Sequence, residues 1–432
     1  MRGSKIKAIN ARQIYDSRAN PTVEVEIFLE GDIIGRGIVP SGASKGRFEA
    51  LELRDGDKGR LNGKSVFNAI ENIKNIISPR LLGIDVTQQE KIDQILIELD
   101  GTENKSRLGA NAILGVSMAA AWAGASFFRV PLYRYLGGDE ANLIPTPMIQ
   151  IIGGGAHANN VIDLQDYLVI PMKSDSFASG YEMVVNVYES TKKIFNQKNK
   201  PLGIADEGGF WPSDFKTNEE GLELLMSGII AAGYIPGEDI AIALDIASSE
   251  FYDQKIKKYV FDLEKKQFTS AEFVDYLCSI QQRYPIISIE DGMAEDDWEG
   301  HQQLSKKLKG KVQLIGDDLF TTNVKRIKKG YDFGINNAVL IKMNQIGTLS
   351  ETLNVIKYTK EIGYLPVISA RSGETEDVTI THLAIATNAG QLKVGSVVRS
   401  ERTVKWNEVI RIEDKLGQKA KYLGKHVFDS II

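Results

Sequence analysis

Ionisable side chains end four successive apolar segments in the second half of the chain. The segments are "IAIALD", "PIISIE", "VQLIGD" and "NAVLIK", which end at Asp245, Glu290, Asp317 and Lys342. If they are parallel strands, their carboxyl ends meet at one mouth, where barrel enzymes carry their chemistry. Three carboxylates around one mouth repel one another unless a divalent cation binds them. Ligands that are all oxygen favour Mg²⁺ or Mn²⁺ over Zn²⁺.

Each carboxylate has a simpler alternative role, because Asp often caps the helix that follows a strand. For one strand alone that interpretation is preferable. For Asp245, Glu290 and Asp317 together it leaves three negative charges on one rim without compensation, so we expect a metal site. Lys342 either acts as a base with a lowered pKa or balances the charge of the acidic rim.

Glycine-rich stretches carry further polar side chains. "GIADEGGF" at 203–210 holds Glu207, either in an ordinary turn or in a loop that presents an acid to the cavity. "IIGGGAHANN" holds His157, a residue that by itself is more often structural than catalytic. The small-residue stretch "PSGASKGRFEALELRDGD" at 40–57 is a weak candidate for a phosphate cradle.

The fifth apolar segment ends differently. In "LPVISARSGETED" at 365–377, Ala370 stands where the other four segments carry an ionisable residue. A methyl group can neither transfer a proton nor bind a metal. Arg371 and Ser372, which follow it, are suited to gripping an anion.

The elements that must position these residues change character along the chain. Residues 5–40 alternate as antiparallel strands do, helical patterns continue to about residue 135, and 136–147 reads as a domain connection. Beyond it, short apolar runs alternate with helix-length segments. The last four intervals between strand ends are 45, 27, 25 and 28 residues, and the shorter ones fit one strand, one helix and two loops. The fold class is therefore α/β.

Composition excludes several classes of protein. The 432 residues include 52 Lys and Arg against 57 Asp and Glu, and a net charge of −5 gives no general attraction to nucleic acid or acidic membranes. One cysteine rules out an internal disulfide and fits a reducing compartment. The apolar stretch 113–128 is too short and too rich in Ala and Gly for a membrane span, so we expect a core helix. These features predict a soluble, cytoplasmic protein.

Long motifs distributed over nearly the whole chain resemble the enolase family. They are "DSRANPTVEVE", "SGASKGRFEALELRDGD", "LDGTENKSRLGANAILGVSMA", "PLYRYLGG", "ADEGGF", "SIEDGMAEDDWEG", "GDDLFTTN", "LIKMNQIGTLSET" and "RSGETED". The resemblance implies an N-terminal α+β domain over 1–137 and a C-terminal β/α barrel over 145–432 whose opening pairs differ from the simple repeat. It also implies a homodimer or a higher assembly of dimers.

The resemblance implies a reaction and roles for single residues. Enolases interconvert 2-phosphoglycerate and phosphoenolpyruvate by taking the C2 proton and then losing the C3 hydroxyl. Two Mg²⁺ ions are expected, the first at Asp245, Glu290 and Asp317 and the second at Ser44. Lys342 matches the base, Glu207 the acid that assists hydroxide departure, and Lys393 the partner of the substrate carboxylate. The other expected site residues are His157, Gln165, Asp166, Ala370, Arg371, Ser372 and Lys45, with Arg371 and Ser372 gripping phosphate.

Several positions depart from the family pattern. The chain has Ala370 for a histidine, Asp166 for a glutamate, Gly153 for an asparagine, Ala205 for a glycine and Lys45 for a threonine. The lost imidazole and the shortened carboxylate fall on the side of the leaving hydroxyl, where an acid–base partner contributes roughly 10²- to 10⁴-fold. Ala370 and Gly153 also remove bulk, which predicts room for a larger substrate, and Lys45 adds positive charge.

Three hypotheses follow. The first is an enolase that is weakened or compensated by another group. The second is a diverged family enzyme acting on a related phospho- or phosphono-substrate, as carboxyphosphonoenolpyruvate synthase does. The third is a noncatalytic binding protein, which the complete set of Asp245, Glu290, Asp317, Lys342 and Lys393 disfavours because a scaffold has no need for a buried charged site.

Overall fold

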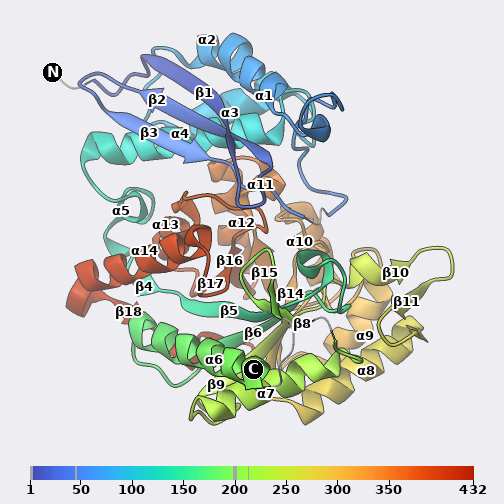
Figure 1. Ribbon diagram of the computed structural model, residues 1–432. Helices are drawn as coiled ribbons and strands as arrows, with labels where there is room; N and C mark the ends of the chain where they lie inside the picture. The colour runs from blue at the N-terminus through green and yellow to red at the C-terminus, as the bar shows by residue number, and fades with distance from the viewer. Residues whose placement is uncertain (1–2, 44–45, 198–201, 213) are drawn as a thin grey trace.

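The amino-terminal part of the chain forms a three-stranded antiparallel sheet covered by helices (Figure 1). The computed structural model describes residues 3–43, 46–197, 202–212 and 214–432. The strands are β1 (Ala8–Tyr15), β2 (Pro21–Phe28) and β3 (Ile34–Ile38). The helices are α1 (Phe67–Asn72), α2 (Ser78–Leu81), α3 (Gln89–Asp100), α4 (Ala110–Phe128) and α5 (Leu132–Gly137). Antiparallel pairing of β1 with β2 and of β2 with β3 confirms the alternation seen over residues 5–40.

Helix α4 is the buried element of this half. It packs on β2 and β3, and its small residues allow a very close approach. A Cβ added at Gly35 would lie 2.1 Å from the backbone nitrogen of Ala123. The helix is long and apolar enough to cross a membrane by length and composition, but 78% of its most apolar window is buried inside the protein. It is the core helix that the Ala- and Gly-rich sequence predicts.

Eight strands close into a barrel in the carboxyl-terminal part. Its order is β5, β6, β9, β13, β14, β15, β16, β17 and back to β5. The strands are β5 (Thr146–Gly153), β6 (Asp166–Pro171), β9 (Ile240–Asp245), β13 (Ile286–Glu290), β14 (Gln313–Gly316), β15 (Ala338–Ile341), β16 (Leu365–Ser369) and β17 (Gln391–Gly395). Strand β6 is antiparallel to both neighbours, β5 and β9, while the other pairs are parallel. The opening of the barrel therefore differs from the simple repeat, as the resemblance implies.

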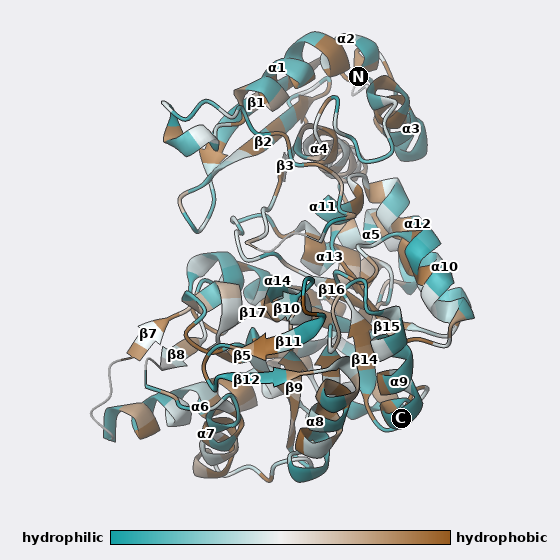
Figure 2. Ribbon diagram, turned by 90° about the vertical axis from the view of Figure 1, so that its right-hand side faces the viewer, coloured by the Kyte–Doolittle hydropathy of each residue, from teal (hydrophilic) through white to brown (hydrophobic). Residues whose placement is uncertain are grey.

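Helices surround the barrel. They are α6 (Phe177–Gln197), α7 (Glu219–Ala231), α8 (Ser270–Arg283), α9 (Trp298–Leu308), α10 (Val324–Asp332), α11 (Met343–Ile346), α12 (Leu349–Glu361), α13 (Thr379–Ala386) and α14 (Ser400–Leu416). In Figure 2 the strands β14 and β15 are brown, whereas α10 and α12 include teal stretches of hydrophilic residues. The main core lies between this ring of helices and the barrel, and a smaller apolar cluster fills the barrel itself.

Strand alternation decides which side chains enter the barrel. Ala241 and Ala243 of β9 belong to the inner cluster, so Asp245, two residues further, points inward as well. Leu340 of β15 is also inside, and Lys342 has its parity. The same rule applies to three further residues that lie two positions from an inner residue of their strand. Asp317 lies two positions from Ile315, Asp166 from Leu168 and Gln150 from Met148.

Candidate active site

Two lysines lie among the strand-end carboxylates. Lys393 Nζ is 2.8 Å from Asp245 Oδ2 and 2.7 Å from Glu290 Oε2, and all three side chains are buried. Lys342 pairs with Asp317. The sequence placed Asp317 and Lys342 at strand ends, but each lies one residue beyond its strand, β14 or β15. The five residues form two ion-paired groups at the barrel mouth, which are close enough for Asp317 and Lys342 to influence the pKa of Glu290.

The ion pairs set the protonation of this network. Burial lowers the pKa of Lys393, but Asp245 and Glu290 outweigh burial and raise it well above its usual range. Burial likewise opposes charge on Lys342, yet Asp317 raises its pKa overall. In the absence of a cation, the pKa of Lys342 thus lies in the direction expected of charge balance, and the lowered pKa of a base stays a prediction for the cation-bound site. A cation that engaged Asp317 would remove the interaction that raises it.

The carboxylates suit a hard divalent cation. Glu290 Oε1 is buried and has no hydrogen-bond partner among the residues that the structure describes, as expected of an oxygen reserved for a ligand. A tighter acidic group, Asp291, Asp317 and Asp318, lies beside it. Asp291 is already used, because its two oxygens accept the backbone N–H groups of Asp317 at 2.9 Å and Asp318 at 2.7 Å. The oxygens of Asp245 and Asp317 accept hydrogen bonds as well, so the predicted set of Asp245, Glu290 and Asp317 stays a proposal that rests on the family resemblance. Ser44 lies outside the described residues.

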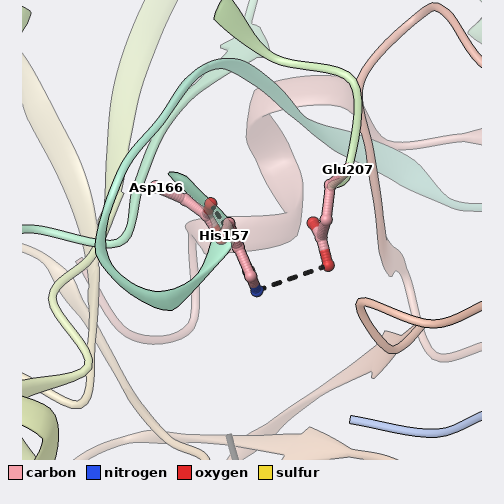
Figure 3. A group of neighbouring side chains, drawn as sticks. All are labelled: His157, Asp166 and Glu207. Atoms are coloured by element: carbon pink, nitrogen blue, oxygen red, sulfur yellow. Dashed lines mark hydrogen bonds and ion pairs between the residues drawn. The ribbon is translucent and has the colours of Figure 1, made fainter. Parts of the chain in front are cut away.

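Across the mouth, His157 lies between two carboxylates (Figure 3). Its Nδ1 is 3.0 Å from Asp166 Oδ1, and its Nε2 is 4.0 Å from Glu207 Oε1. Burial disfavours the charged ring, but Asp166 and Glu207 outweigh burial and raise the pKa of His157 to about 9. The ring is therefore an imidazolium at neutral pH. The hydrogen bond to Asp166 and the ion pair with Glu207 account for the charge of the ring.

The antiparallel direction of β6 brings Asp166 to the mouth. Asp166 is the first residue of β6 and pairs with Asp245, the last of β9, so both lie at the same end of the barrel. Gln165, just before it, donates from Nε2 to Asp245 Oδ2 at 3.1 Å. Strand β6 and strand β15 are four positions apart in the ring of eight. Asp166 and Lys342 therefore face each other across the barrel.

The expected phosphate grip is held by the amino-terminal part of the chain. Arg371 Nη1 lies 3.0 Å from Glu49 Oε2, and Ser372 Oγ accepts the backbone N–H of Ala43 at 2.6 Å. Lys45 lies outside the described residues. Ala370 is 5% exposed and follows β16 directly.

One cavity brings most of the expected residues together. It is lined by Gly42, His157, Gln165, Asp166, Glu207, Asp245, Lys342, Ser369, Ala370, Arg371, Ser372 and Lys393. The expectation of extra room at Gly153 is wrong, because a Cβ there would lie 2.5 Å from the Cβ of Ala205. The methyl group of Ala205 fills the space that Gly153 leaves.

Sequence reasoning missed three residues that support the site. Gln150 donates to Asp166, Glu49 pairs with Arg371, and Arg402 donates to the backbone oxygen of Arg371 at 2.6 Å. Gln150 had a signal, a single polar residue inside the apolar run "PMIQII". Glu49 and Arg402 had none, because each lies in a charged helical or loop segment of ordinary composition.

Comparison with known proteins covers the whole chain. Residues 6–136 match the family model described as the N-terminal domain of enolase, and residues 141–431 match the C-terminal TIM barrel domain of enolase. Enolase 1 of Desulfitobacterium hafniense (strain Y51) is 63% identical over 428 residues, which are 99% of this chain and 98% of that protein.

Proposed function

This chain belongs to the enolase family, and on that premise we propose that it interconverts 2-phosphoglycerate and phosphoenolpyruvate as a hydro-lyase. The observation that carries the proposal is the position of Lys342 across the barrel from His157, Asp166 and Glu207, all lining one cavity. Its lining places a base and an acid on opposite sides, the arrangement that proton transfer at two neighbouring carbons of a small phosphorylated acid requires. The similarity to enolases gives no added support to the alternative hypothesis of a diverged enzyme that acts on a phosphono-substrate.

On the base side, neutral Lys342 takes the C2 proton and becomes an ammonium. The electron pair left at C2 spreads into the substrate carboxylate, which gains negative charge. Lys393, whose ammonium is stabilised by its carboxylate neighbours, is placed to oppose that charge. We propose Mg²⁺ as the cofactor, two ions per site, held by Asp245, Glu290 and Asp317 and by Ser44. When bound, Mg²⁺ supplies positive charge that stabilises the enolate.

On the leaving-group side, the C3–O bond breaks, its electrons leave with the hydroxide, and the C2 electron pair forms the C2=C3 bond. A proton from the His157 imidazolium, or from Glu207 when that carboxyl group is protonated, lets the hydroxide depart as water. His157 offers a charged donor that Ala370 does not. Arg371 and Ser372 bind the phosphate, and Gln165 and Lys45 complete the substrate contacts.

We also propose that the protein is cytoplasmic and assembles as a dimer or from dimers. The charge balance gives it no general affinity for nucleic acid or membrane. Residues 1–137 and 145–432 are its two domains, the first supplying loop residues that reach the barrel mouth.

The test follows both halves of the reaction in one tube. 2-Phosphoglycerate is incubated with the protein and Mg²⁺ in deuterated water, and NMR records loss of the C2 proton and growth of phosphoenolpyruvate. We expect product to form, with C2 exchange faster than elimination, because Lys342 and its partners are complete while Ala370 offers no proton donor on the acid side. Chelation of Mg²⁺ should stop both signals.

Lys342→Ala should abolish the exchange, and Lys307→Ala, an exposed lysine on α9, is the matched control. Elimination that keeps pace with exchange would show that His157 and Glu207 fully replace the missing imidazole. Neither exchange nor elimination, with folded protein and bound ligand, would contradict the proposed function.

A further inference from the structure

A buried glutamine joins the Asp166 carboxylate to the loop that carries Glu207. Gln150 lies on β5 and is completely buried. Its Nε2 donates to Asp166 Oδ1, and its Oε1 accepts the backbone N–H of Gly209 at 2.7 Å. Gly209 stands two residues after Glu207. One amide therefore touches both the carboxylate that holds His157 and the loop that carries Glu207.

The orientation of this amide is fixed by its partners. A carboxylate oxygen at Asp166 only accepts, and the backbone nitrogen of Gly209 only donates, so Nε2 must face Asp166 and Oε1 must face Gly209. Reversing the amide would place acceptor against acceptor and donor against donor in a buried site.

The packing around Gln150 allows little movement. A Cβ added at Gly209 would lie 2.5 Å from Gln150 Oε1, and one added at Gly153 would lie 3.2 Å from Gln150 Nε2. Two residues without side chains therefore make the space that the glutamine fills. Such close packing holds the amide in one rotamer.

We propose that Gln150 is a positioning residue for the elimination step, which aligns Asp166, and through it His157, with the loop that bears Glu207. The inference rests on the proposed function, since it assigns a role within that reaction. The acid side needs this alignment because a proton donor acts only within hydrogen-bond reach of the leaving oxygen. Asp166 shares its Oδ1 between His157 and Gln150, so a lost amide contact frees the carboxylate to rotate.

The lengths of the two side chains provide the test. Gln150→Asn withdraws the amide by one methylene, and Asp166→Glu advances the carboxylate by one. Each single variant should lower phosphoenolpyruvate formation about 10- to 100-fold, as loss of a supporting hydrogen bond does around other sites. C2 exchange should change less than about twofold, because Lys342 lies across the barrel. The double variant Gln150→Asn, Asp166→Glu should recover elimination to within about threefold of the unmodified protein.

A residue with only a structural role would behave differently. Its substitution would lower C2 proton exchange and elimination together. Moving one methylene from Gln150 to Asp166 in the double variant would then not restore the elimination rate. Gln313→Asn is the matched control: Gln313 is equally buried at the start of β14, and its Oε1 accepts from Ser288 Oγ at 3.1 Å. We expect it to leave the ratio of exchange to elimination unchanged.

A second readout needs no turnover. NMR titration of the His157 ring should shift in each single variant and return in the double variant. Two results would overturn this inference alone, provided that the unmodified protein forms phosphoenolpyruvate. One is an elimination rate that neither single variant changes. The other is a double variant that eliminates no faster than the slower single variant. If the unmodified protein forms no product, the proposed function fails. In that case the titration of His157 still tests the positioning role of Gln150, and a titration that is unchanged in both single variants overturns it.

Discussion

His157 is a cation inside the protein whose charge depends on two neighbours. Burial alone would keep the ring neutral, and the carboxylates of Asp166 and Glu207 reverse that preference. Asp166 gains in turn, because despite its burial the charged ring of His157 contributes to a pKa below the usual range. In the folded protein both His157 and Asp166 are therefore charged at neutral pH, and the His157 imidazolium is available as a proton donor.

This pair predicts a pH dependence of stability. The pKa of His157 rises from 6.5 to about 9 on folding, so its stabilisation is complete below pH 6.5 and is lost as pH rises through 9. The full effect is roughly 3 kcal/mol at 1.36 kcal/mol per pKa unit. We expect His157→Gln to lower the thermal midpoint most below pH 6.5 and least above pH 9. His426→Gln, which changes a histidine that pairs with Asp429 at an exposed position, is the control. A difference that is constant with pH would contradict the charged pair.

At the scale of elements, the end of β5 packs against the loop before β8 (Phe210–Pro212). The contact is between Gly153 and Ala205, where an added Cβ would lie 2.5 Å from an existing one. Carbon atoms in contact normally lie about 3.5–4.0 Å apart. The two elements approach this closely because one of the two positions has no side chain.

We expect Gly153→Ala to destabilise the protein by about 1–3 kcal/mol, the usual cost of overpacking. Ala205→Gly should relieve the collision, so the double variant should be more stable than Gly153→Ala alone. Urea unfolding of the four proteins in the cycle measures the coupling between the two positions. Additive effects of the two substitutions would show that the elements separate easily.

Most of the barrel and its charged rim could be predicted from the sequence. Apolar runs and their intervals located β9, β13, β14, β15 and β16, because a strand buried on both faces is a continuous apolar run. The bounds were a residue long at Asp317, Lys342 and Ala370, where the chain has left the sheet; Asp317 and Lys342 keep the inward direction of their strands.

The remaining contacts could not be predicted from local patterns. The resemblance implied only that the opening pairs of the barrel differ from the simple repeat, and the reversed direction of β6 was not predicted, since alternation does not reveal strand direction. The contacts of Gln150 with Asp166 and of Gly153 with Ala205 join residues 16 and 52 positions apart. Such contacts depend on sheet order and register, which composition and periodicity leave open.

At the scale of the whole molecule, the amino-terminal part reaches onto the barrel mouth. Ser41 and Gly373 exchange two backbone hydrogen bonds, at 2.9 and 2.8 Å, and the indole nitrogen of Trp122 donates to Thr379 at 2.9 Å. Through Glu49, this half also supplies a carboxylate to Arg371. The amino-terminal half therefore contacts both residues expected to hold the substrate phosphate, Arg371 and Ser372.

Glu49 and a phosphate are both anions that Arg371 can bind. We expect Glu49→Gln to tighten binding of inorganic phosphate by about tenfold, which corresponds to about 1.4 kcal/mol, because the competing charge is removed and the size is kept. Inhibition of turnover by phosphate measures the effect. Glu103→Gln, an exposed glutamate paired with Lys325, is the control. Weaker phosphate binding would show that Glu49 holds Arg371 in its productive orientation.

The matched sizes at Gly153 and Ala205 restrict how such a sequence can change over generations. A larger residue at position 153 fits without a steric clash only after Ala205 has been replaced by glycine. The stable intermediate between the two states therefore has glycine at both positions. The reverse order leads through a crowded, unstable protein that selection removes. Lineages that differ at both positions are therefore connected by one mutational order, and an ancestor between them is expected to carry the two glycines.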